Sequence, residues 1–309
     1  MKRLIVLGAL VLAGVSSIAV RASQDQAPKK VSIITMNVMD ILYVLTGGGG
    51  NSLAMMRDDG VVLVDSKLPG WGRPILEAIQ SVSDKPVTTI INTHTHGDHT
   101  GSNIEFPTVT EIVAHENTKA NMAKMDAFKG ANARFLPNKT VGDKLSLFDG
   151  LDRIDLYYFG RGHTDGDVVV VFPGKGVAHF GDLFPAKMAP IIDTTNGGSG
   201  SAYPETLAKA AAAVTGVDRV VTGHFAARAP MRAGVPGSVI YTFFDTLRWS
   251  DVREYADFVR EFVAAVQSAK KAGKTVDEAV AGLTLPERFK GYDMGPAKRA
   301  AEAIYSETK

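Results

Sequence analysis

Short apolar runs separated by turn residues dominate the first two thirds of the chain. Runs rich in Val and Ile predict strands, at 31–38, 41–45, 52–56, 61–64, 87–91, 109–114, 154–159, 168–172, 177–180 and 219–221. Helices are predicted at 74–82, 117–128 and 204–214. Clusters of early strands, with helices intervening later, predict a mixed α/β or α+β domain of layered sheets with helices outside.

The pattern changes near residue 240. Apolar side chains recur three, four or eight positions apart across 240–266, which places them on one helix face. Gly273 ends that helix, and Thr275 with Glu278 forms a capping box for a second, shorter one. A third helix is predicted at 297–305. We therefore expect a helical extension, packed on the main domain, from residue 240 to the end.

The first 22 residues have the layout of a secretory signal peptide. A Lys-Arg pair follows the first Met, an apolar run covers 4–20, and small residues precede a cleavage point after Ala22. The alternative is an uncleaved membrane anchor, but Ser16 and Ser17 interrupt the run and it is shorter than a membrane span. We expect export to the periplasm or beyond, with no stable membrane insertion after cleavage.

Charge and cysteine content exclude several functions. The 309 residues carry a formal net charge of +1 without a run of like charges, so nucleic acid is not expected as a partner. The chain has no Cys, which excludes disulfides, zinc–thiolate sites, iron–sulfur clusters and a cysteine nucleophile. Any metal ion must be held by His, Asp or Glu.

Three of the seven histidines fall within six residues. His94 and His96 end a predicted strand and point the same way, because side chains two apart share a face. Gly97 lets the chain turn, so Asp98 and His99 face a neighbouring point. This one segment can therefore offer ligands to two metal ions.

Further candidate ligands follow other predicted strands. His163, Asp182 and His224 lie at strand-to-loop transitions, each flanked by Gly. Strand ends along one edge of a sheet can aim side chains at a shared point. Imidazole and carboxylate ligands suit two Zn²⁺ ions, and Fe or Mn remain open.

Five separate segments between about residues 31 and 225 resemble the metallo-β-lactamase superfamily, in that family's order. They are Val64-Asp65-Ser66, His94-Thr95-His96-Gly97-Asp98-His99, Gly162-His163-Thr164, Gly181-Asp182 and Gly223-His224. The resemblance implies an α+β fold, a four-layered αββα sandwich with the metal site at one edge of two sheets. The chain then divides into the signal peptide (1–22), the catalytic domain (23–239) and the helical extension (240–309).

The resemblance also implies roles for individual residues. The first metal ion would be bound by His94, His96 and His163, the second by Asp98, His99 and His224, with Asp182 bridging them. Asp65 would orient a ligand from the 94–99 loop. A hydroxide shared by two Zn²⁺ ions would attack a carbonyl of a small-molecule acyl substrate, with Asp98 as the catalytic residue that orients it or takes its proton.

The residue at position 182 bears on the branch of the family to which the chain is similar. An Asp at position 182 is typical of hydrolases resembling glyoxalase II, of lactonases and of phosphodiesterases, which favours hydrolysis of an ester, lactone, thioester or lactam. Alternatives are β-lactamase activity as the main function, a mononuclear iron oxidoreductase resembling persulfide dioxygenases, and a metal-holding protein without catalysis.

Other polar and glycine-rich positions are assigned structural roles. His115 is expected to cap a strand-to-helix junction, and His179 lies an odd number of residues before Asp182, which places it on the opposite face of the strand. Lys187 is expected to be solvated, with a substrate carboxylate as the alternative partner. The four glycines at 47–50 predict a turn or a loop pressed close to another element.

Overall fold

The first of two sheets contains seven strands in chain order. The computed structural model describes residues 32–36, 41–224 and 247–307. The strands of this sheet are β1 (Ser32–Met36), β2 (Leu42–Thr46), β3 (Ser52–Arg57), β4 (Gly60–Val64), β5 (Val87–Ile91), β6 (Glu111–His115) and β7 (Lys139–Val141). The strands from β1 to β4 are antiparallel hairpin neighbours, whereas β4, β5, β6 and β7 run parallel. The sheet therefore changes character at β4.

The second sheet contains six strands in the order β13-β12-β11-β10-β9-β8. These are β8 (Lys144–Leu147), β9 (Ile154–Tyr158), β10 (Val168–Phe172), β11 (Val177–His179), β12 (Arg219–Val221) and β13 (Leu247–Arg248). Among these described strands, β11 and β12 pair in parallel and the other neighbours pair antiparallel. All five residues of β10 are buried, as expected for a Val-rich strand that is covered on both faces.

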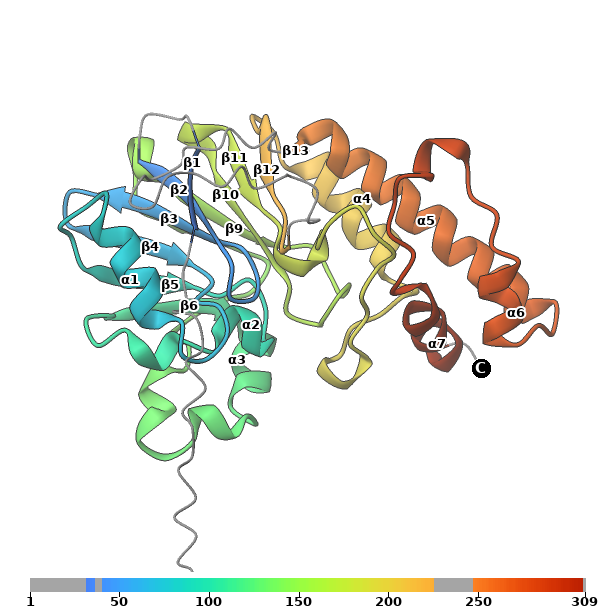
Figure 1. The fold of residues 1–309 in the computed structure, drawn as a ribbon, viewed down its shortest axis with the longest axis horizontal. Helices are drawn as coiled ribbons and strands as arrows, with labels where there is room; N and C mark the ends of the chain where they lie inside the picture. Colours follow the sequence, from blue (N-terminus) through green and yellow to red (C-terminus); the bar gives the residue numbers. More distant parts are fainter. Residues whose placement is uncertain (1–31, 37–40, 225–246, 308–309) are drawn as a thin grey trace, which may run out of the picture.

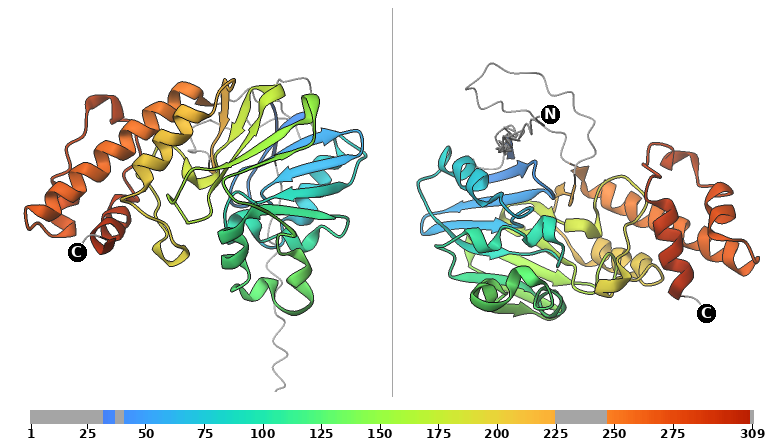
Figure 2. Two further views of the ribbon diagram at one scale, coloured as in Figure 1. Left: turned by 180° about the vertical axis from the view of Figure 1, so that it is seen from behind. Right: turned by 60° about the horizontal axis from the view of Figure 1, so that its bottom comes forward.

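Helices cover the outer face of each sheet. They are α1 (Gly72–Gln80), α2 (Gly97–Thr100), α3 (Glu116–Met122), α4 (Tyr203–Ala213), α5 (Trp249–Lys271), α6 (Val276–Ala281) and α7 (Ala297–Glu307). Figure 1 shows α1 to α3 on the side of the first sheet and α4 to α7 on the side of the second. The two further views in Figure 2 keep these groups on opposite sides.

Three apolar clusters lie between the layers. One joins facing residues of the two sheets, one fills the space between the first sheet and its helices, and the largest joins the second sheet to α4, α5 and α7. The helix α5 contributes seven buried side chains to this last cluster, all on one face. This layering confirms the αββα sandwich expected from the sequence.

The structure adjusts several predicted elements. The helix expected across 240–266 begins at Trp249, after the short strand β13, and the helix expected at 117–128 ends at Met122 and gives way to 3₁₀ turns. The strands β7 and β8 were not predicted, since they are short and partly exposed. The capping box of Thr275 and Glu278 is confirmed.

Both predicted domain boundaries, after residue 22 and at 240, lie outside the described residues, as does the predicted signal peptide. Within the described ranges, the structure contains no helix that is both long and apolar enough to cross a membrane.

Candidate metal centre

The carboxyl ends of strands from both sheets meet at one edge of the sandwich. In the first sheet, Asp65 follows β4 and residues 92–99 follow β5, which runs parallel to it. In the second sheet, Asp182 follows β11 and His224 follows its parallel neighbour β12. His163 belongs to the turn that leads into β10. Parallel strands therefore deliver these side chains to one place.

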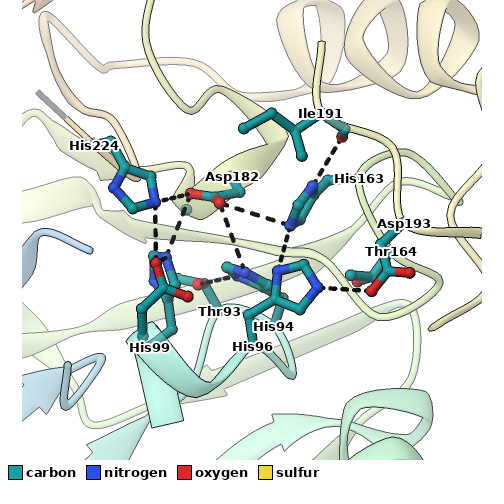
Figure 3. Close-up of polar contacts among 12 residues, drawn as sticks. Thr93, His94, His96, His99, His163, Thr164, Asp182, Ile191, Asp193 and His224 are labelled. Atoms are coloured by element: carbon teal, nitrogen blue, oxygen red, sulfur yellow. Dashed lines mark hydrogen bonds and ion pairs between the residues drawn. The ribbon is translucent and has the colours of Figure 1, made fainter. Parts of the chain in front are cut away.

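All seven side chains singled out from the sequence come together at this edge, and Figure 3 labels each of them except Asp98. They form two groups in which the ligand atoms lie within 4.8 Å of one another: His94, His96, His163 and Asp182 in the first, and Asp98, His99 and His224 in the second. Apart from Asp182, which falls in the first group, the side chains are grouped as the resemblance implied.

The carboxylate of Asp182 lies between the two groups. Its Oδ2 is 3.9 Å from His94 Nε2 and 3.6 Å from His163 Nε2. Its Oδ1 is 3.4 Å from His99 Nε2 and 3.3 Å from His224 Nε2. One oxygen thus faces each group, which is the geometry of a bridging carboxylate.

The tautomers of His96 and His163 are fixed by hydrogen bonds on the side of each ring that faces away from the centre. His163 Nδ1 lies 2.8 Å from the carbonyl oxygen of Ile191, and His96 Nε2 lies 2.7 Å from Asp193 Oδ2. Both partners only accept, so these nitrogens carry the hydrogens. The other nitrogens, His96 Nδ1 and His163 Nε2, face each other at 2.9 Å. In the neutral rings they present two lone pairs to a common point, as a cation requires.

Asp65 fixes His94 and His99 in the same way. Its carboxylate accepts hydrogen bonds from the backbone N–H and the hydroxyl of Thr93, and His99 Nδ1 lies 2.7 Å from Asp65 Oδ2. Because the Thr93 hydroxyl donates to Asp65, it accepts from His94 Nδ1 at 3.0 Å. Both Nε2 atoms then point into the centre, and Asp65 has the orienting position expected for it.

The centre contains buried polar atoms without hydrogen bonds. Within the described part of the chain, His94 Nε2, His99 Nε2 and Asp182 Oδ1 are fully buried and make none. Leaving such atoms unpaired costs about 1–3 kcal/mol each, so groups of this kind call for a partner. Divalent cations would satisfy all three atoms at once, and the donor set of imidazoles and carboxylates fits them.

Burial and mutual charge shift the protonation of the centre. Burial, reinforced by the neighbouring His99, lowers the pKa of His94 well below its ordinary value. Burial opposes ionisation of Asp182, but His99 and His224 hold its pKa well below the usual range. The centre therefore presents an ionised carboxylate and a neutral His94, both ready to bind a cation.

Three of the seven side chains reach solvent. His96, Asp98 and His224 are 27%, 29% and 33% exposed, whereas His94, His99 and His163 are buried. Asp98 Oδ2 lies 3.3 Å from His224 Nε2. Asp98 is thus the acid on the solvent side of the centre.

Sequence reasoning missed the two groups that orient His96 and His163. Asp193 and the carbonyl of Ile191 belong to residues 186–201, which we call the support loop. Asp193 precedes a Thr-Thr-Asn-Gly turn and also accepts from the backbone N–H groups of Thr195 and Asn196, so its sequence context indicates only a cap. His96 lowers the pKa of Asp193 against the effect of burial, which keeps the carboxylate ionised.

Replacing Asp193 by alanine is expected to weaken binding of a divalent cation about 10- to 100-fold, because His96 loses the partner that fixes its tautomer. Titration with Zn²⁺ against a chromophoric chelator measures this change. Asp193→Asn, which keeps an acceptor oxygen, is the matched control and is expected to lose less. Equal affinity in the alanine variant and the unsubstituted chain would contradict this role.

The remaining histidines lie outside the centre. His115 accepts from the backbone N–H of Asn117 and caps α3, as predicted. His179 is buried, with Nε2 3.1 Å from the carbonyl oxygen of Asn51 and Nδ1 accepting from the backbone N–H of Gly181. It belongs to neither ligand group.

Curated relatives cover part of this chain. The 2,4-dinitroanisole O-demethylase subunit alpha of Nocardioides sp. (strain JS1661) is 34% identical over 156 residues, 49% of this chain and 46% of that protein. Hydroxyacylglutathione hydrolase of Synechocystis sp. is 33% identical over 122 residues, 38% and 41% of the two chains. Metallo-beta-lactamase type 2 of Bacillus cereus is 29% identical over 133 residues, 40% and 46%. The chain thus spans less than half the length of these three relatives.

Solved structures share the fold. A metallo-beta-lactamase from Pontibacter korlensis, 18% identical, covers 75% of this chain and 99% of its own, with a TM-score of 0.58. The sec-alkyl sulfatase PisA1, as a double mutant and 12% identical, covers 90% of this chain and 50% of its own, with a TM-score of 0.65. The family model of the metallo-beta-lactamase superfamily matches residues 45–224. Because that segment is 180 of the 309 residues, the protein belongs to the metallo-beta-lactamase superfamily.

Proposed function

We propose that this protein is an exported hydrolase that holds two Zn²⁺ ions and attacks the carbonyl group of an ester, lactone, thioester or lactam. The observation that carries the proposal is the set of fixed tautomers. His94, His96, His99 and His163 are oriented from behind so that their free nitrogens and the two oxygens of Asp182 face two adjacent positions. Export rests on the signal peptide predicted at 1–22.

Divalent cations bound at these two positions would lower the pKa of a bound water molecule and would stabilise negative charge on a carbonyl oxygen. The chain's own residues do the rest. Asp182 places one carboxylate oxygen toward each position, and Asp98, on the solvent side, is placed to orient a water molecule and to accept its proton. This mechanism needs no side-chain nucleophile, which agrees with a chain that contains no Cys.

The completeness of both groups favours two ions over one. A single iron of the dioxygenase type would use His94, His163 and Asp182. In this protein His99 and His224 also face Asp182 Oδ1, and Asp98 completes their group. The second group would have no chemical use in a mononuclear oxidoreductase, so hydrolysis is the better explanation.

The relatives support a broad range of substrates. They include a hydroxyacylglutathione hydrolase, several metallo-beta-lactamases and an O-demethylase subunit. These names indicate that relatives act on substrates of different kinds. β-Lactam hydrolysis as the main activity is the second candidate. It ranks lower because cysteine-containing lactamases have a metal-binding Cys at the position that Asp182 occupies in this chain.

Metal content and turnover test the proposal together. Elemental analysis of the purified chain is expected to give two equivalents of zinc. Removal of the metal with a chelator is expected to abolish hydrolysis, and added Zn²⁺ to restore it. The substrate panel contains nitrocefin, lactones, thioesters including a hydroxyacylglutathione, phosphodiesters and 2,4-dinitroanisole.

Two outcomes would replace the proposal, and a third would narrow it to one substrate class. One equivalent of iron with oxygen consumption would indicate the oxidoreductase. A metal-holding protein would bind zinc and turn over no substrate, and Asp98→Ala would change its metal content without changing any rate. Turnover of nitrocefin far above every other substrate would make the protein a β-lactamase.

A further inference from the structure

The support loop, which orients two imidazoles of the centre, is held from outside by the C-terminal helices. Its middle residues Ile191 and Asp193 contact His163 and His96 (Figure 3). Both of its ends contact residues of α5, of α7 or of the segment between α6 and α7. We propose that the helices α5 to α7 set the affinity of the His94–His96–His163 position for its cation, with Glu307 as a positioning residue. This inference rests on the proposed metal centre.

The carboxylate of Glu307 fastens the far end of the support loop. Glu307 is the last described residue of α7, and it accepts from Ser199 Oγ at 2.9 Å and from the backbone N–H groups of Gly200 at 2.7 Å and Ser201 at 3.1 Å. Three hydrogen bonds to one ionised group are stronger than three neutral ones. They hold the turn that leads from the support loop into α4.

Close packing carries this constraint back toward the imidazoles. A Cβ atom on Gly200 would lie 2.5 Å from Ile304 of α7 and 3.0 Å from Ile192, so the loop backbone is pressed against both side chains. Ile192 packs on the apolar cluster to which Ile304 belongs. It lies between Ile191 and Asp193, the two residues that contact the imidazoles.

The near end of the support loop is also fastened by C-terminal residues. Asp293, between α6 and α7, donates its N–H to the carbonyl of Lys187 and accepts from the N–H of Ala189. The ammonium group of Lys187 lies 2.6 Å from Asp251 and 3.1 Å from Glu254, both on α5. These ion pairs correct the sequence expectation that Lys187 would be solvated or meet a substrate carboxylate.

The inner side of the loop is tied directly to the His163 turn. The N–H of Asp193 donates to the carbonyl of His163, and the N–H of Ser199 donates to the carbonyl of Gly162. A Cβ on Gly198 would lie 2.2 Å from the carbonyl oxygen of His163, so these backbones are in contact. A shift of the loop would therefore move both His163 and the Asp193 carboxylate that orients His96.

Two of the three ligands of the second position are held independently of the support loop. His99 is oriented by Asp65, which follows β4 in the first sheet, and Asp98 follows β5. These two residues are held by a different sheet from the one that α5 and α7 cover. The third ligand, His224, follows β12 of the second sheet, and its N–H donates to the carbonyl of Pro185 directly before the support loop. Loosening the support loop is thus expected to change the affinity of the first position more than that of the second.

The test is Zn²⁺ titration of the full metal-free chain against a chromophoric chelator, comparing Glu307→Gln with the unsubstituted protein. We expect one of the two ions to bind about tenfold more weakly, because orienting partners of metal ligands change affinity by that order, while the other stays within about twofold. Glu302→Gln, an exposed position on the same helix, is the matched control and is expected to change neither affinity.

A second variant shows whether Glu307 acts through the support loop. In an Asp193→Ala background, Glu307→Gln is expected to weaken Zn²⁺ binding by less than it does alone, since both substitutions disturb the same imidazole. Unchanged affinities for both ions in Glu307→Gln, or an equal loss of affinity in both backgrounds, would overturn the inference. This holds even if Glu307→Gln lowers the urea concentration at which half of the protein is unfolded.

A further pair of outcomes separates this inference from the proposed function. Binding of two ions without turnover of any substrate would rule out the proposed function and leave this inference in place. A chain that binds no Zn²⁺ would end both.

Discussion

Replacing Asp182 by asparagine is expected to weaken binding of both cations by roughly 10²- to 10⁴-fold and to lower kcat/KM for hydrolysis by at least as much. The two oxygens of Asp182 face one ligand group each. Removing one partner from a buried ion pair costs about 3–5 kcal/mol, which corresponds to this range of affinity. The amide N–H group of the variant would, in addition, compete for the lone pairs of the imidazole nitrogens and would offer no lone pair to a cation.

Metal stoichiometry after dialysis and steady-state kinetics at saturating Zn²⁺ measure these two effects separately. Asp59→Asn is the matched control, because Asp59 lies in the turn between β3 and β4 with its side chain 72% exposed. Urea unfolding of the metal-free Asp182→Asn chain shows whether the fold persists. Loss of one ion only, with activity retained, would show that Asp182 serves a single position and does not bridge.

The placement of the ligand residues was predictable because local sequence and topology agree. Residues 94–99 follow the apolar run at 87–91, and His163, Asp182 and His224 each follow a Gly near the end of a short apolar run. Parallel pairing of β4 with β5 and of β11 with β12 brings run ends from each sheet to one edge. The spacing of His94 and His96 then fixes their shared direction. No knowledge of the loops was needed to bring these residues together.

The support of the centre could not be predicted in the same way. Asp193 and Glu307 act across 97 and 107 residues of chain, respectively, and neither lies at a strand end. Their sequence contexts, a turn and the end of an amphipathic helix, are satisfied by purely local roles. The strands β7 and β8 escaped prediction because Lys, Ser and Thr occupy their exposed positions, which leaves too few apolar residues for a period to show.

Lys67 is a further residue that sequence patterns did not reveal. It is fully buried, and its Nζ donates to the carbonyls of Leu45 at 2.9 Å and Gly50 at 2.7 Å. Gly50 in turn donates its N–H to the carbonyl of Asp98, and a Cβ on Gly50 would lie 2.2 Å from the His99 ring. The glycine segment at 47–50 is therefore a loop pressed against the centre, and Lys67 holds it there.

Because burial lowers the pKa of Lys67 from 10.5 to about 7, stability is expected to depend on pH through this one group. Between those two values the unfolded chain holds a proton that the folded chain has released, so the free energy of unfolding rises with pH by up to ~1.4 kcal/mol per unit. Replacing Lys67 by methionine removes this contribution. The difference in unfolding free energy between the unsubstituted chain and the variant should therefore grow by roughly 3–4 kcal/mol from pH 7 to pH 10.

Urea unfolding of the metal-free proteins at a series of pH values measures that difference, in which the titrations of all other groups cancel. Lys85→Met, at an exposed position before β5, is the matched control and should give a curve parallel to that of the unsubstituted chain. Parallel curves for Lys67→Met as well would mean that the folded protein keeps Lys67 protonated up to its ordinary pKa. The two carbonyls of Leu45 and Gly50 would then stabilise a buried ammonium ion, and the glycine loop would be held by charge at every pH at which the protein folds.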